Sequence, residues 1–288
     1  MRYVVAVGGN ALKSGKVLNK LSASIAQLAA RGNEIVITHG NGPQVGRLAM
    51  RGKKSLAALT RVTQAEIGSE IRKSLIHVDK RTGTGAKVIF TRVVVDGDDA
   101  EFVNPTKPIG EFYGRAEAEK LARRGFVMKR LLKGYRRVVP SPRPVRIVEL
   151  GEIKKVLESG RIAIAAGGGG IAVIEKGGRL AYADAVIDKD LASALLAIRI
   201  KADRLLILTD VDGVFLGYHT KRSHLLRRTT ASALRRLAVH EHFEAGSMLP
   251  KVRACVEFVS ATGKRAAIGS LMKADAVFAS RSGTQVTK

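Results

Sequence analysis

Four consecutive glycines follow an apolar segment rich in β-branched residues, and this run constrains the fold of the chain more than any other feature. The stretch reads IAAGGGGIAVIE, from Ile164 to Glu175. Two further apolar segments also end in glycines, VVAVGGNAL from Val4 and IVITHGNGPQVG from Ile35, and each continues into a segment with a helical pattern. Repeated strand, glycine turn and helix indicate an α/β protein.

Strand-like and helical segments alternate along the rest of the chain. The strand-like segments are RYVVAVGG, NEIVITHG, AKVIFTRVVV, RIAIAAGGGG, RLLILTDVDGV and ADAVFAS. SASIAQLAARG and GEIKKVLESG carry apolar residues at helical spacing and end in glycine, as helices often do. We therefore predict an α/β fold in which helices pack on a mostly parallel central sheet.

Residues 105–146 form a distinct segment within an otherwise undivided chain of 288 residues. Prolines restrict the backbone at both of its ends, in PTKP and in PSPRP, which predicts stiff, extended connections. Lys and Arg outnumber acidic residues here, so the segment is either a positive flap over an anionic ligand or a solvated surface insertion. No linker or repeat divides the rest, and we expect one domain over residues 1–288 with this inserted flap subdomain.

The glycine turns suit a phosphate ligand. Ligands of parallel α/β sheets bind at the carboxyl ends of the strands, where bare backbone N–H groups and helix N-termini attract anions. Each turn alone is as well explained by a tight connection, but three of them favour a shared polyphosphate site. None spells a P-loop or G-x-G-x-x-G, so a different phosphate-binding fold is required.

Three lysines are candidates for the cations that phosphoryl transfer requires. Lys189 lies between Asp188 and Asp190 at the start of an apolar helical run, where an Asp can cap the helix and orient the lysine. Lys251 opens a second helix after a proline, and Lys129 lies inside the flap segment. The alternative for Lys189 is a capping aspartate beside a surface lysine.

A formal charge of +25 raises nucleic acid or an acidic membrane as partners. The basic residues are spread along the chain without any nucleic-acid module signature, so solvated surfaces and attraction of anionic substrates are the favoured explanations. We expect no membrane partner and a cytoplasmic location, since no leader or long apolar run is visible. The single Cys255 is expected to be a buried helix residue, and no metal-binding spacing appears.

The motifs of this chain closely resemble those of the carbamate kinases of the amino acid kinase superfamily, essentially from end to end. The matching segments are GGNAL, THGNGPQVG, NPTKPIGEFY, GYRRVVPSPRP, AAGGGGIAVIE, AVIDKDLASALLA, LTDVDGV and HFEAGSMLPKV. The resemblance implies a three-layer α/β/α sandwich, a homodimer and a protruding flap. It also implies reversible phosphoryl transfer between MgATP and carbamate, which gives ADP and carbamoyl phosphate.

The resemblance assigns roles to residues of this chain. It implies that Lys189 stabilises the transferring phosphoryl group, Asp190 organises that lysine, and Lys251 reaches the nucleotide phosphates. The flap lysine that engages the small acid is Lys129 or Lys133, since the segment that follows is one residue shorter than in the family. The implied substrate-binding residues are Gly8, Gly9, Asn10, Gly40, Asn41, Gly42, Gly167, Gly168 and Gly169, and those on the nucleotide side are Asp210, Asp212, Tyr218 and Met248.

The implied chemistry needs no general base, because carbamate is already a nucleophilic carboxylate. His39, which precedes the second glycine turn, is therefore interpreted as a hydrogen-bonded structural histidine. Mg²⁺ is expected to bind mainly to ATP oxygens, so no protein ligand is assigned to it. Two alternatives stay open: a related kinase of another small carboxylate or phosphate, and a basic nucleic-acid-binding protein on a kinase fold, although no specific nucleic acid is expected.

Overall fold

A computed structural model describes residues 1–8, 14–52, 54–131, 133–218, 220–240, 243 and 247–288. Its central element is an eight-stranded sheet in the order β15-β17-β16-β12-β1-β2-β9-β3. These strands are β1 (Arg2–Val7), β2 (Glu34–His39), β3 (Lys87–Val88), β9 (Ala163–Ile164), β12 (Arg204–Thr209), β15 (Arg228–Thr230), β16 (Arg265–Ser270) and β17 (Thr284–Thr287). Only the pairing of β16 with β17 is antiparallel, which confirms the predicted mostly parallel sheet.

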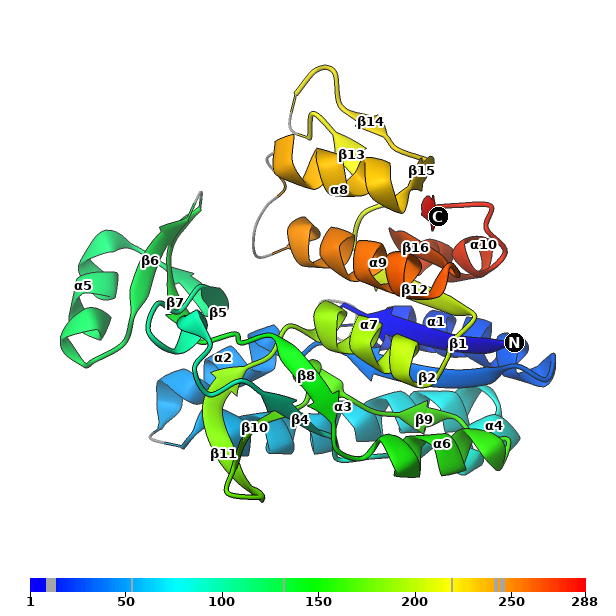
Figure 1. The fold of residues 1–288 in the computed structure, drawn as a ribbon, viewed down its shortest axis with the longest axis horizontal. Coiled ribbons are helices and arrows are strands. Elements are labelled where there is room, and N and C mark those ends of the chain that lie inside the picture. The colour runs from blue at the N-terminus through cyan, green and yellow to red at the C-terminus, as the bar shows by residue number, and fades with distance from the viewer. Residues whose placement is uncertain (9–13, 53, 132, 219, 241–242, 244–246) are drawn as a thin grey trace.

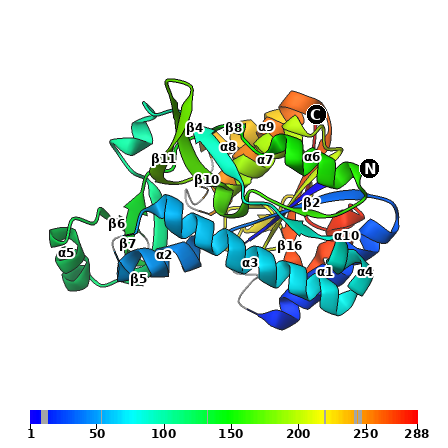
Figure 2. The same ribbon diagram turned by 90° about the horizontal axis from the view of Figure 1, so that it is seen from below.

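Helices cover both faces of this sheet. Because side chains alternate along a strand, Val4 and Ala6 of β1 face one core cluster while Val5 and Val7 face the other. The first cluster is covered by α6 (Leu150–Glu158), α7 (Lys189–Arg199) and α9 (Met248–Thr262), with α8 (Ala231–His240) beside α9. The second is covered by α1 (Gly15–Ala30), α3 (Leu56–Val78) and α10 (Ala274–Phe278), with α4 (Lys80–Gly85) beside α3. Figures 1 and 2 show the resulting three layers.

Two strand predictions need correction. ADAVFAS was expected to be a strand, but Ala274–Phe278 is the helix α10. Ala274, Val277 and Phe278 are buried at helical spacing, a period that a short apolar run does not reveal by eye. The segment AKVIFTRVVV was read as one strand but forms β3 and then β4 (Arg92–Val95), which belong to different sheets.

A second, four-stranded sheet extends from the carboxyl-end side of the first. Its order is β11-β10-β4-β8, with β8 (Pro144–Ile147), β10 (Ile171–Lys176) and β11 (Arg179–Val186). The glycine turn at Gly167–Gly169 connects β9 of the main sheet to β10 of this one. A short hairpin of β13 (Phe215–Leu216) and β14 (His224–Leu225) lies beyond β12. The glycine turn is therefore flanked by a strand of each sheet, β9 before it and β10 after it.

The flap segment contains its own small sheet. It consists of β5 (Lys107–Tyr113), α5 (Arg115–Arg123), β6 (Met128–Leu131) and β7 (Gly134–Val139), in the strand order β5-β7-β6. Figure 1 shows this unit at the left, beside α2 (Gly42–Arg51), and its last residues continue into β8. That residues 105–146 act as a separate subdomain on hinges stays a prediction. Within the described residues, no helix is long and apolar enough to cross a membrane.

Candidate active site

The start of α7 is the centre of the site. Asp188 caps this helix, because its carboxylate accepts hydrogen bonds from the backbone N–H groups of Asp190, at 2.8 Å, and Leu191, at 3.3 Å. The cap places Lys189 and Asp190 in the first helical turn, where the N-terminal end of the helix favours negative charge. The predicted D-K-D motif is therefore both a helix cap and part of a buried ionic site.

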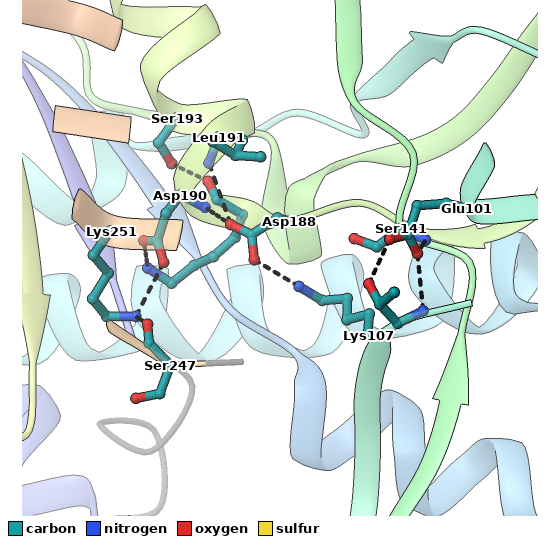
Figure 3. Close-up of polar contacts among 11 residues, drawn as sticks. Glu101, Lys107, Ser141, Asp188, Asp190, Leu191, Ser193, Ser247 and Lys251 are labelled. Carbon is teal, nitrogen blue, oxygen red and sulfur yellow. Dashed lines mark hydrogen bonds and ion pairs between the residues drawn. The ribbon is translucent and has the colours of Figure 1, made fainter. Parts of the chain in front are cut away.

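Lys189, Asp190 and Lys251 form a buried group that we name the lysine cluster. The Asp190 side chain is only 3% exposed and accepts hydrogen bonds from the Nζ atoms of both lysines, that of Lys251 at 3.0 Å. Lys251 comes from α9 and also donates to the carbonyl oxygen of Ser247, at 3.1 Å (Figure 3). Two predicted catalytic lysines, 62 positions apart in sequence, thus meet on one carboxylate.

The charges of the lysine cluster determine how its members ionise. Burial opposes ionisation of Asp190, but the two adjacent ammonium groups outweigh it and hold the pKa of this carboxyl well below its usual range. Burial likewise opposes protonation of Lys251, but the charge of Asp190 outweighs it and raises the pKa of Lys251. For Lys189, burial prevails and lowers the pKa, with the charge of Lys251 adding to it.

Lys107 is a site residue that sequence reasoning missed. Its Nζ lies 2.7 Å from Oδ2 of Asp188, with the two side chains 21% and 15% exposed (Figure 3). The contact joins β5 of the flap segment to the N-terminus of α7. The signal was present in PTKP, where a lysine between two prolines is held in an extended strand at the base of the flap.

The two lysines predicted for the flap role lie elsewhere. Lys129, on β6, donates from Nζ to Oδ1 of Asn104 at 3.1 Å in an exposed contact. Lys133 is exposed and lines a flap pocket with Phe112 and Tyr135. Among the described contacts, neither lysine reaches the lysine cluster. The structure thus brings together Lys189, Asp190, Lys251 and Lys107, but neither of these two.

The four-glycine turn passes directly over the second glycine turn. A Cβ atom at Gly167 would lie 2.3 Å from Nε2 of His39, and one at Gly168 would lie 2.2 Å from Nδ2 of Asn41. Gly168 also has a φ of +63°, in the left-handed region. Side chains are therefore excluded here by space as well as by backbone conformation.

The same turn also packs on the approach to α7. A Cβ atom at Gly169 would lie 2.3 Å from the carbonyl oxygen of Ile187, which directly precedes the helix cap Asp188. Three distant segments thus meet near the lysine cluster: the turn after β2, the turn after β9 and the start of α7. The structure shows what each glycine admits, namely the side chains of His39 and Asn41 and the backbone of Ile187.

Gln64 holds the glycine turn and was also missed. This residue of α3 is buried, and its Nε2 donates to the carbonyl oxygens of Gly167, at 3.0 Å, and Thr91, at 3.1 Å. Its Oε1 accepts from the backbone N–H of Thr91 at 2.9 Å. The only signal in the sequence was a polar residue on the buried face of a helix. Satisfied buried amides of this kind fix backbone position strongly.

His39 is neutral in the folded protein. It is buried at the end of β2, and its Nδ1 lies 3.3 Å from the carbonyl oxygen of Gly40. Burial outweighs the opposing hydrogen bond to Gly40 and, with a smaller contribution from the charge of Lys189, lowers the pKa of this imidazole to about 4. Packed against Gly167, the ring supports the glycine turn, in agreement with a structural role.

The other predicted phosphate-binding residues lie at neighbouring strand ends. The N–H of Gly8 donates to the carbonyl oxygen of Leu208 at 2.9 Å, and that of Gly40 donates to Val7 at 3.0 Å. Asn41 precedes α2, which begins at Gly42, and Nδ2 of Asn41 donates to Thr63 at 2.9 Å. Gly9 and Asn10 lie outside the described residues.

The predicted nucleotide-side residues lie after β12 and at the start of α9. Burial opposes protonation of Lys251, and the charges of Asp190, Asp188 and, least of the three, Asp210 raise its pKa, which places Asp210 near the lysine cluster. Asp212 pairs with Lys273 at 2.8 Å on the surface. Met248 begins α9 and packs against the first core cluster. The ring of Tyr218 lies 5.8 Å from that of Phe215 and is largely exposed.

No metal centre is visible within the described part of the chain, where no group of three or more His, Cys, Asp or Glu side chains could hold an ion. The carboxylates nearest the site, Asp188 and Asp190, are occupied by lysines and helix N–H groups. The donors gathered at this site are cationic or backbone N–H groups, and they suit an anionic ligand.

Comparison with known proteins gives a consistent result. The model of the amino acid kinase family matches residues 1–270. The carbamate kinase of Pyrococcus horikoshii is 43% identical over 310 residues and 99% of both chains. The carbamate kinase-like protein YqeA of Escherichia coli is 39% identical over 305 residues, covering 99% of this chain and 98% of its own. The structure of carbamate kinase from Giardia lamblia bound to AMP-PNP superimposes with a TM-score of 0.87 at 36% identity, covering 100% of this chain and 98% of that one.

Proposed function

Because the chain belongs to the amino acid kinase family, we propose that it is a carbamate kinase, which exchanges a phosphoryl group between MgATP and carbamate. The observation that carries the proposal is the lysine cluster, in which two buried ammonium groups share one carboxylate next to the glycine turns. Full-length similarity to the Pyrococcus horikoshii enzyme supports carbamate as the acceptor. As in the resemblance, the working unit is proposed to be a homodimer.

The glycine turns and the lysines are proposed to bind the nucleotide phosphates. The relative from Giardia lamblia is bound to AMP-PNP, an ATP analogue, and its chain matches this one along its full length. The glycine turns would let phosphate oxygens approach the backbone closely, and the positive N-terminal end of α7 would add electrostatic attraction. Mg²⁺ would be bound by the oxygens of ATP, because Asp188 and Asp190 are already paired with lysines.

The chemistry follows from the charges at the site. A carbamate oxygen attacks the γ-phosphorus, and the bond from that phosphorus to the oxygen bridging to the β-phosphorus breaks, which releases ADP. No proton has to be removed from carbamate, so Asp190, held ionised, positions the two lysines and does not act as a base. Lys189 and Lys251 balance the negative charge that spreads over the phosphoryl oxygens in the transition state.

The flap is proposed to contribute Lys107 to the small acid. Its ammonium group pairs with Asp188 at the N-terminus of α7, whereas Lys129 donates a hydrogen bond to Asn104, which directly precedes the flap. A flap cation that pairs with Asp188 can exchange this partner for a substrate carboxylate or phosphate. Lys129 stays a candidate from the resemblance, and direct comparison of the two lysines decides between them.

A coupled assay tests the proposed function. With ADP, Mg²⁺ and carbamoyl phosphate the protein should form ATP, and Lys189→Ala should lower kcat by about 10²- to 10³-fold, the usual effect of removing one charge-stabilising group. Lys176→Ala, at an exposed lysine that ends β10, is the control and should retain activity. In the same assay Lys107→Met should lose more activity than Lys129→Met. Full turnover by Lys189→Ala would contradict the proposed mechanism.

A second candidate is a kinase of another small carboxylate or phosphate. The Escherichia coli relative, at 39% identity over 99% of this chain, is named a carbamate kinase-like protein. Similarity at this level is therefore also found with a protein that is not named simply carbamate kinase. A panel of small acids with MgATP distinguishes the two functions. Turnover of another acid with none of carbamate would favour this candidate, while the lysine cluster would keep its role.

A further inference from the structure

A pocket of about 540 Å³ lies at one edge of the main sheet, and we name it the edge pocket. Its volume falls within the range of small-molecule sites. It is lined by Arg228, Thr229, Thr230, Arg265, Ser280, Gln285, Val286 and Thr287. None of these residues belongs to the lysine cluster or to the glycine turns, so the edge pocket is separate from the candidate active site.

The strand register places most of the polar lining on one face of the sheet. Arg228 of β15 pairs with Gln285 of β17, and Thr230 pairs with Thr287. Paired residues and residues two apart point to the same face of a sheet, so these four side chains share a face. Gln285 pairs in turn with Ala267, which lies in the core cluster beneath α10. The edge pocket therefore lies on the face of the sheet that α10 covers.

The edge pocket lies at the opposite end of the strands from the lysine cluster. Arg204 and Arg265 are the first residues of the parallel strands β12 and β16 and pair with each other. The glycine turns follow the last residues of parallel strands, β1, β2 and β9. A six-residue strand such as β12 separates its two ends by about 17 Å. A ligand in the edge pocket would not contact a phosphoryl group at the lysine cluster.

Arg204 is a buried arginine in contact with a residue that lines the pocket, and one of its N–H groups has no hydrogen-bond partner. Arg204 is only 8% exposed, and its Nη2 donates to Oε1 of the lining residue Gln285 at 3.2 Å. Nη1 donates to the carbonyl oxygen of Phe278 at 3.2 Å, while the buried Nε has no hydrogen-bond partner. Burial, together with the charge of Arg265, lowers the pKa of Arg204. A buried guanidinium without a counter-charge is costly, and an anion nearby would reduce that cost.

Within the residues that the structure describes, no carboxylate forms an ion pair with the arginines around the pocket. The ion pairs found among the described residues include none from Arg204, Arg228 or Arg265. The polar side chains that line the pocket are guanidinium, hydroxyl and amide groups, all of which can donate hydrogen bonds. This donor set, with the planar fork of arginine, is complementary to a phosphate group.

We propose that the edge pocket binds a phosphate-bearing small molecule. A solvated basic edge would also keep β15 from pairing with another chain, but that role does not account for the buried Arg204 with its unpaired Nε. The volume exceeds that of a single phosphate group, so both inorganic phosphate and a nucleoside monophosphate fit the chemistry. The two sources share the phosphate and differ in the remaining part of the ligand.

Calorimetric titration tests the edge pocket, with inorganic phosphate and AMP as separate probes at constant ionic strength. Binding should weaken at least tenfold in Arg228→Gln and in Arg265→Gln, whose side chains lie at the surface and leave the core intact. Arg281→Gln is the matched control, since it removes an exposed arginine near the pocket that does not line it. Phosphate bound at the lysine cluster is unaffected by these substitutions, so the difference isolates the edge pocket.

The possible results distinguish a nucleoside phosphate from inorganic phosphate as the ligand, and specific binding from general attraction to a positively charged protein. Tighter binding of AMP than of phosphate, lost in both lining variants, identifies a nucleoside phosphate as the ligand class, and equal binding identifies the phosphate group alone. Unchanged binding in Arg228→Gln and Arg265→Gln overturns the proposal. An equal loss in Arg281→Gln also overturns it, because that result would reflect only the net charge of +25. None of these outcomes depends on the activity of the lysine cluster.

Discussion

Asp190 holds the two lysines of the candidate active site in place. It is the only described carboxylate that contacts both Lys189 and Lys251, and it is nearly inaccessible to solvent. Its charge partly offsets the effect of burial on the Lys189 ammonium group and more than offsets it for Lys251. A residue that touches neither substrate in the proposed mechanism therefore determines where the catalytic charges lie.

Asp190→Asn should destabilise the fold and reduce turnover. Removing the carboxylate charge leaves two buried ammonium groups without their counter-charge, a change that costs about 3–5 kcal/mol in buried pairs. Urea unfolding measures the loss, and the coupled assay measures kcat. Glu152→Gln is the matched control, since its pair with Lys87 lies outside the site, is about half exposed and is worth about 1 kcal/mol or less. Equal stability of the two variants would show that the lysine cluster does not depend on Asp190.

The glycine turn is the element on which the site geometry depends. Gly167–Gly169 pass within contact distance of His39, Asn41 and Ile187, and Gln64 bonds to the turn from α3. The turn therefore has two functions: it exposes backbone, and it allows three segments to approach one another. This answers why bare backbone is needed even before any ligand binds.

Gly168→Ala should destabilise the protein by about 2–5 kcal/mol. The methyl group would lie 2.2 Å from Nδ2 of Asn41, which adds overpacking of about 1–3 kcal/mol to the strain of about 1–2 kcal/mol from a left-handed backbone. Gly177→Ala isolates the strain, because Gly177 also has a positive φ, +54°, but has nothing within 4 Å. Thermal unfolding compares the two variants. A loss in Gly168→Ala no greater than that in Gly177→Ala would refute the packing argument.

The flap segment shows how a motif can be correct while the chosen residue in it differs. The prolines of PTKP predicted an extended connection, and Lys107 begins β5 within that motif. The resemblance assigned the flap role to Lys129 or Lys133, which stays a prediction, because linear sequence does not reveal that the base of the flap meets α7. The ion pair between Lys107 and Asp188 spans 81 positions and exists only in the folded chain.

For the whole molecule, the net charge agrees with the proposed reaction. All its substrates, carbamate, ATP, carbamoyl phosphate and ADP, are anions, and a protein with a charge of +25 attracts them. The described ion pairs use only some of the 50 basic residues. Excess positive charge of this kind favours association with anionic ligands in general, so specificity has to come from the sites themselves.

The stability of the molecule should fall as the pH drops from about 6.5 to about 4. His39 has an ordinary pKa of 6.5 when unfolded and about 4 when folded, so the unfolded chain binds a proton that the folded chain excludes. The difference corresponds to about 3 kcal/mol once the pH is below 4. Urea unfolding at several pH values should show a smaller acid loss in His39→Gln than in the natural protein. His224→Gln, at an exposed histidine, is the control, and a pH dependence in His39→Gln equal to that of the natural protein would contradict this assignment.

What the sequence alone determined was the α/β class, the parallel sheet and the glycine turns, which follow from periodicity and local motifs of neighbouring residues. The roles predicted for Lys189, Asp190 and Lys251 rest on the family resemblance. Short or ambiguous segments were predicted less well, as the helix Ala274–Phe278 shows, because a few apolar residues fit either a strand or a helix.

Only the tertiary structure decided which residues meet. The pairing of Lys251 with Asp190, the contact of Lys107 with Asp188, the support of Gly167 by Gln64 and the arginines of the edge pocket all join segments far apart in the chain. Burial then set the ionisation of Asp190 and His39. Such contacts and their electrostatics depend on distance and solvent exclusion, and neither is defined until the chain has folded.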